Sequence, residues 1–118
     1  MSIFEFMHPQ ISLRNGFKDF KAESYDSSFD IWSLGVVLYY LCYRKSPFRK
    51  PGRECFSKTI LREFLEKRYE IVFSRRFGSV NELIGLCLRA GSWKEVRDYL
   101  VREEEVFNEI DFGERPFA

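Results

Sequence analysis

The chain has 118 residues, which is the size of a single domain. Its 19 lysine and arginine residues nearly balance its 18 aspartate and glutamate residues, so its charge gives no reason to expect nucleic acid or an anionic membrane as a partner. Its 3 cysteines are an odd number and form no C-x-x-C pair, a pattern that disfavours a disulfide framework and fits an intracellular compartment, the cytoplasm or the nucleus.

The N-terminal residues 1–25 show no regular spacing of apolar side chains. Pro9, Asn15 and Gly16 interrupt this part, so we expect irregular loops with short turns. It also lacks the basic start and the long apolar stretch of a secretion signal. No helix or strand is therefore predicted before residue 27.

An unusually apolar helix is predicted next. Ser27 and Asp30 have the spacing of a capping box, and from residue 31 to residue 43 the only strongly polar side chain is Ser33. As a helix this segment is roughly 20 Å long, whereas a bilayer crossing needs about 20 residues. We therefore expect a helix enclosed by protein on all sides, which ends before Pro47.

Three later segments have the spacing of amphipathic helices. The first runs from Cys55 to Tyr69, and residues 70–78 after it are expected to be irregular or briefly extended. The second opens on a capping box at Ser79 and ends at Gly91, and the third opens in the same way at Ser92. The expected inner faces comprise Phe56, Ile60, Leu61, Phe64 and Leu65; Val80, Leu83, Ile84, Cys87 and Leu88; and Val96, Leu100, Phe107 and Ile110. The predicted class is all-α, with one central buried helix and about three amphipathic ones.

The apolar helix closely resembles a signature of eukaryotic protein kinases. The run Asp30-x-Trp32-Ser33-Leu34-Gly35-Val36-x-Leu38-Tyr39, followed by Pro47-Phe48, is similar to D-x-W-S-L-G-V-x-L-Y…P-F of that family. In kinases this segment forms the central helix of the C-terminal lobe. The order Ser-Leu-Gly after the tryptophan resembles the serine/threonine branch.

Two flanking segments extend the resemblance. Phe6-Met7-His8-Pro9-Gln10 is similar to the Tyr-Met-Ala-Pro-Glu that ends the kinase activation segment, and Leu83-Ile84-x-x-Cys87-Leu88 is similar to a late helix of the lobe. The resemblance implies that residues 1–118 are one partial kinase-like domain, the second half of a C-terminal lobe. The residues to which it gives a structural role are Phe6, Pro9, Gln10, Asp30, Trp32, Gly35, Pro47 and Phe48.

Several positions depart from the family pattern. Gln10 stands where kinases have a glutamate, and Glu95 stands where they have the arginine that pairs with it. Ile3 replaces a threonine that contacts the catalytic loop. Arg44 replaces the glycine that ends the central helix, at a cost of about 1 kcal/mol if it adopts a left-handed conformation. Asp30 keeps only the role of an acidic residue at a helix start, because the loop that it would contact is absent.

The parts that transfer phosphate are missing. The sequence contains no G-x-G-x-x-G loop, no V-A-I-K lysine and no H-R-D, and its single histidine, His8, has no metal-ligating neighbours of recognised spacing. Asp111-Phe112-Gly113 resembles the kinase metal motif but follows the lobe helices instead of preceding them, so we interpret it as a polar turn. We expect no catalytic residue, no cofactor and no metal.

Three functions remain open from the sequence. The first is an inactive kinase-like protein that binds a protein partner, or a second copy of itself, through apolar surface that the shortened lobe leaves bare on the central helix. The second is a fragment or mis-started gene model of a once-active serine/threonine kinase. The third is a helical adaptor whose likeness to kinases is accidental. Whether the chain is an enzyme is left open, although we expect it to be inactive as it stands.

Overall fold

The structure is a computed structural model that describes residue 9 and residues 28–89 and 92–110. Within these ranges the chain is helical, without β-strands, which confirms the predicted all-α class. The elements are α3 (Ser28–Tyr43), α4 (Lys58–Leu65), η3 (Arg75–Phe77), α5 (Gly78–Leu88), α6 (Trp93–Arg102) and η4 (Val106–Glu109), of which η3 and η4 are short 3-10 helices.

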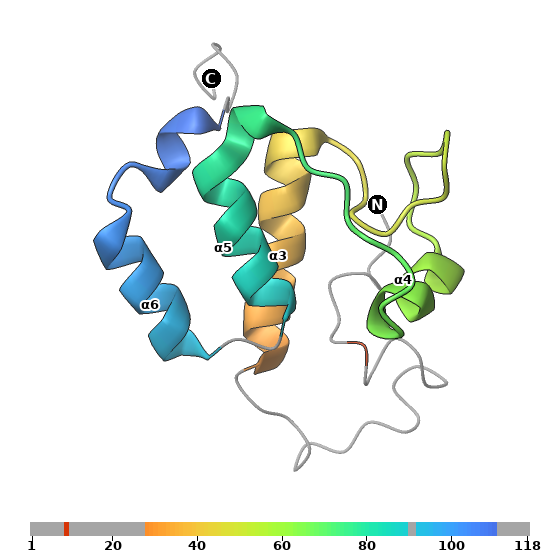
Figure 1. The fold of residues 1–118 in the computed structure, drawn as a ribbon, viewed down its shortest axis with the longest axis horizontal. Coiled ribbons are helices and arrows are strands. Elements are labelled where there is room, and N and C mark those ends of the chain that lie inside the picture. The colour runs from red at the N-terminus through yellow and green to blue at the C-terminus, as the bar shows by residue number, and fades with distance from the viewer. Residues whose placement is uncertain (1–8, 10–27, 90–91, 111–118) are drawn as a thin grey trace, which may run out of the picture.

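Helices α3 and α5 form the centre of the fold and lie side by side along their length (Figure 1). Their close approach depends on Gly35, because a β-carbon at that position would lie 2.7 Å from Cβ of Cys87. Helices α6 and η4 pack on α5. Helix α4 reaches α3 through Phe64, whose ring lies 6.3 Å from that of Trp32. Two central helices, rather than one, therefore carry the core.

The apolar side chains of α3 are mostly covered. Those of Ile31, Trp32, Val36 and Leu38 are buried, and only Val37, at 42% exposure, lies largely open to solvent. The expectation that this helix keeps a broad bare apolar surface is therefore wrong. The reason is that its buried side chains join one core cluster with those of α4, α5 and α6.

Both α3 and α4 end on a residue in the left-handed conformation that normally favours glycine. Arg44 has φ of 59° and donates its N–H to the carbonyl of Tyr40, so the strained helix end expected at this position is confirmed. Lys67 has φ of 62° in a Schellman motif, in which Arg68 N–H bonds to the Glu63 carbonyl. Each side chain costs about 1 kcal/mol relative to glycine.

Of the three predicted serine caps, Ser27 lies outside the described residues, and one of the other two is confirmed. Ser92 caps α6 as expected, because its hydroxyl accepts the N–H of Glu95 at 3.2 Å. Ser79 caps nothing: α5 begins one residue earlier, and its N-cap is Phe77, which makes no side-chain cap. Helix α4 is shorter than the predicted range of 55–69, since Ser57 caps its start.

The inner face of the last helix differs from the expected one. Helix α6 ends at Arg102, so Phe107 lies in η4 and is 41% exposed instead of buried. The sequence also missed Tyr99, which is buried and donates its hydroxyl to the carbonyl of Ser79. Burial, together with the nearby carboxylates of Glu82 and Glu103, raises the pKa of Tyr99 to about 12.

Disulfides and membrane-spanning helices are two features that the sequence disfavours. All three cysteines lie in the described ranges, and none of them forms a disulfide. Over the same ranges, no helix has the length and the apolar character needed to cross a membrane.

Candidate functional site

The residues of the kinase-like motif gather at the N-terminal half of α3. Trp32 stacks on Phe48 with ring centroids 5.5 Å apart and planes 2° from parallel. Both rings are buried, as are Gly35 and Pro47. This packing gives a physical reason for the fixed spacing between the tryptophan and the Pro-Phe pair. Pro9 is also buried, whereas Phe6 and Gln10 lie outside the described residues.

The polar residues of the motif take local roles. Asp30 is exposed in the first turn of α3, where a carboxylate stabilises the helix start. The N–H of Glu95 is bound by the Ser92 cap. Gln10, which stands opposite Glu95 in the family pattern, and Ile3 lie outside the described residues.

Among the described residues, no cluster of three or more His, Cys, Asp or Glu side chains is suited to hold a metal ion. The Asp111-Phe112-Gly113 motif and His8 lie outside the described ranges.

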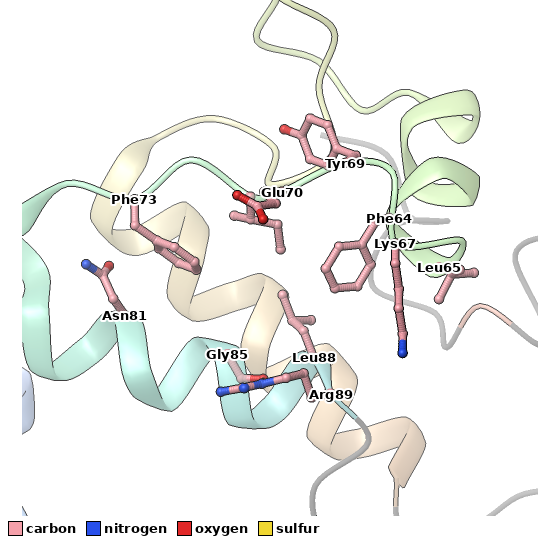
Figure 2. Close-up of a pocket in the computed structure, with 11 residues that line it drawn as sticks. Phe64, Leu65, Lys67, Tyr69, Glu70, Phe73, Asn81, Gly85, Leu88 and Arg89 are labelled. Atoms are coloured by element: carbon pink, nitrogen blue, oxygen red, sulfur yellow. The ribbon is translucent and has the colours of Figure 1, made fainter.

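An open groove of about 820 Å³ is the candidate site (Figure 2). One side is formed by the end of α4 with Phe64 and Leu65, and the opposite side by α5 with Asn81, Gly85 and Leu88. Most of its lining is apolar, and Leu65 is 43% exposed although it is a large apolar side chain. Its volume lies within the range of small-molecule sites, and it is open to solvent.

The remaining wall is the segment Tyr69–Ser74, which we call the strap. It connects α4 to η3 without helical structure, so the expectation of an irregular or briefly extended segment over residues 70–78 is met up to residue 74, whereas residues 75–78 are helical. Tyr69 and Ile71 are half-buried while Glu70 and Val72 are exposed, an alternation that follows the period of two of an extended chain as far as Phe73, which is 39% exposed. Tyr69, Glu70, Ile71 and Phe73 line the groove.

Tyrosine hydroxyls of α3 fix the strap in place. Tyr39 donates its hydroxyl to the carbonyl of Val72 at 2.7 Å and accepts a hydrogen bond from Arg49 at 2.9 Å. Tyr43 accepts the N–H of Ser74 at 2.9 Å and donates to the amide oxygen of Asn81. Burial raises the pKa of both tyrosines above the usual value, so they stay protonated donors near neutral pH.

Further contacts hold the two ends of the strap. At its start, the Tyr69 hydroxyl donates to the carbonyl of Pro47 at 3.1 Å, which ties the strap to the buried Pro-Phe pair. At its end, the side-chain amide of Asn81 donates to the carbonyl of Ser74 at 2.7 Å. Phe73 lies across the rings of Tyr39 and Tyr43 in edge contacts. Side-chain hydrogen bonds and ring contacts, and not the backbone hydrogen bonds of a β-sheet, therefore hold this wall of the groove in place.

Charged side chains stand at the rim of the groove. In Figure 2, Lys67 stands beside the end of α4 and Arg89 at the end of α5, while Glu70 belongs to the strap. The ion pairs of the described chain are Arg68 with Glu66 and Arg97 with Asp98, so neither Lys67 nor Arg89 has a carboxylate partner there. Lys67 is also one of the two strained helix ends. Lys67 therefore combines a left-handed helix end with a place on the rim of the groove.

The comparisons with known proteins add no relative. No family model, no curated protein and no solved structure matches the chain.

Proposed function

We propose that the chain is a kinase-like helical module that does not transfer phosphate and acts by binding another protein. The binding site is the groove between α4, α5 and the strap. The kinase likeness rests on the motif of residues 30–48, and the protein-binding role rests on the groove.

The buried cluster around Trp32 supports the first part of this proposal. Tryptophan, glycine and the Pro-Phe pair each have a packing role: Trp32 stacks on Phe48, and Gly35 admits α5. Packing roles of this kind suit a part in shaping the helical core rather than a part in chemistry. The sequence lacks the loops that would hold nucleotide, which favours binding over catalysis.

The single observation that carries the binding role is the exposure of large apolar side chains in and beside a preformed groove. Leu65, Phe73 and Val72 are 43%, 39% and 59% exposed. Leu65 and Phe73 line the groove itself. Exposed apolar side chains gathered at a concave site are typical of protein-interaction sites.

The test selects peptides from an unbiased displayed library on the purified chain and measures their affinity by fluorescence anisotropy. The variant Gly85→Gln places a side chain on the groove floor, where a β-carbon meets only the flexible end of Arg89. The matched control is Gly78→Gln on the same helix, where a β-carbon meets no atom within 4 Å. We expect Gly85→Gln to weaken binding at least tenfold and Gly78→Gln to leave it unchanged.

Two results would overturn the proposal. One is a failure to select any peptide, or equal binding by both glycine variants. The other is saturable binding of Mg-ATP with transfer of phosphate to a protein substrate by the purified chain, which would revive the fragment-of-a-kinase reading.

A further inference from the structure

Resting on the proposed protein-binding function, we propose how the partner binds: as an extended peptide that pairs with the free edge of the strap. The peptide sends apolar side chains into the groove at alternate positions, and it carries an acidic residue on the side of Lys67 and Arg89. This is recognition by β-strand addition.

The first step of the argument is the direction of the strap's backbone groups. In an extended chain the N–H and C=O of one residue point the same way, and this direction alternates along the chain. The carbonyl of Val72 and the N–H of Ser74 both bind tyrosines of α3. The backbone groups of Ile71 and Phe73 therefore point away from α3.

The second step is that this outward edge has no partner. Within the described residues, the N–H and C=O groups of Ile71 and Phe73 make no hydrogen bond. An extended segment with one edge fixed and the other edge open is a template for another strand. Because the strap is anchored by side chains of Tyr39, Tyr43 and Tyr69, it is held ready to accept one.

The third step concerns the side chains of the peptide. Tyr69, Ile71 and Phe73 all line the groove, so alternate side chains of a strand laid beside them face the same apolar space. The charges then set its chemistry: Lys67 at the end of α4 and Arg89 at the end of α5 have no carboxylate partner among the described residues, whereas Glu70 belongs to the strap itself. An acidic residue facing the two cations fits this arrangement, and a basic one there is repelled.

The direct test is amide hydrogen exchange of the wild-type chain by NMR, with and without a peptide selected from the unbiased library. We expect the peptide to slow exchange at Ile71 and Phe73 at least tenfold. The neighbouring amides of Glu70 and Val72, which face α3, should change little. Equal protection of all four amides, or of none, contradicts strand addition.

A second test probes the peptide's own backbone. Methylating its amide nitrogens one at a time should weaken binding at least tenfold at every second position and hardly at the positions between. A helical partner would instead lose affinity wherever the methyl group falls. If Gly85→Gln prevents binding of a peptide whose methylation shows no alternating pattern, this inference is wrong and the proposed function still stands.

The charge requirement is tested with Lys67→Gly. This variant should raise the urea midpoint of unfolding, because glycine suits the left-handed helix end, so a weaker complex cannot be blamed on unfolding. We expect it to weaken peptide binding about fivefold, while Lys58→Gln, which removes a charge from α4 outside the groove, has no effect. Replacing the peptide's acidic residue by its amide should cost the wild type more than it costs Lys67→Gly.

Two outcomes count against the proposal as stated. If replacing the peptide's acidic residue by its amide weakens binding equally to the wild type and to Lys67→Gly, the acidic residue does not contact this lysine. Concentration-dependent dimers in which Ile71 and Phe73 become protected without any peptide show that the edge is covered by a second copy of the chain.

Discussion

The contact between α3 and α5 leads to a quantitative prediction for Gly35→Ala. The new β-carbon would lie 2.7 Å from Cβ of Cys87 and 3.0 Å from Cδ2 of Leu88, while carbon atoms pack best at about 3.5–4.0 Å. The leucine side chain can rotate, but the β-carbon of Cys87 moves only with the backbone of α5. The two helices must therefore separate by about 1 Å at this point.

The expected cost follows from two opposed effects. Overpacking of a tight core costs about 1–3 kcal/mol, and removing a glycine from a helix interior returns about 0.5–1 kcal/mol. Because the clash involves a main-chain-linked atom, we expect a net loss of about 1–2 kcal/mol of unfolding free energy. Gly85→Ala is the matched control, since its β-carbon meets only the end of Arg89 at 3.2 Å and should stabilise by about 0.5 kcal/mol.

Urea denaturation followed by circular dichroism measures both variants, and the stability change is read from the midpoint at constant slope. The diagnostic quantity is the difference between the two alanine variants, about 2 kcal/mol. If Gly35→Ala proves as stable as Gly85→Ala, α3 and α5 do not approach each other as closely as described, and the packing reason for the motif glycine is lost.

Three further predictions concern a helix end, a buried hydroxyl and the thiols. Arg44→Gly should raise the unfolding free energy by up to about 1 kcal/mol in urea titrations, whereas Arg44→Ala should not, because only glycine adopts the left-handed conformation freely. The folded-state pKa of Tyr99 lies at about 12, above the ordinary value of 10.0, so its contribution to stability is complete below pH 10 and is lost as the pH rises towards 12. Urea midpoints measured between pH 8 and pH 11 should fall less steeply in Tyr99→Phe than in the wild type, and parallel curves would contradict the assignment. Iodoacetamide should modify the exposed Cys55 first and spare Cys87 until the chain unfolds, because burial raises the pKa of Cys87 to about 11; peptide mapping by mass spectrometry gives the order.

The sequence predicted those elements whose signals are local. The apolar run of α3, the serine cap of α6 and the strained end at Arg44 each depend on neighbours within a few residues, and the structure agrees with all three. Ser79 shows the limit of such signals. Its spacing to Glu82 fits a capping box, yet η3 leads directly into α5 and leaves no separate start to cap.

The groove could not be predicted because it depends on contacts between distant parts of the chain. In the sequence the strap is recognisable only as a short segment that is irregular or briefly extended. Its place is set by Tyr39 and Tyr43, which lie more than thirty residues earlier and look like ordinary members of an apolar helix. The sequence also assigned the bare apolar surface to α3, whereas most of the large exposed apolar side chains of the described residues, among them Leu65, Val72 and Phe73, lie outside that helix.

The anchoring of the strap has a consequence for folding order and for ligand linkage. Its hydroxyl contacts span separations of 33, 31 and 22 residues, so the groove wall forms only after α3 has met its neighbours. Partial opening of the core should remove this wall early, before the helices themselves melt. Binding of a molecule to the groove is thus coupled to folding of the whole domain. At a concentration of 100 times its Kd, such a molecule would raise the free energy of unfolding by about 2.7 kcal/mol.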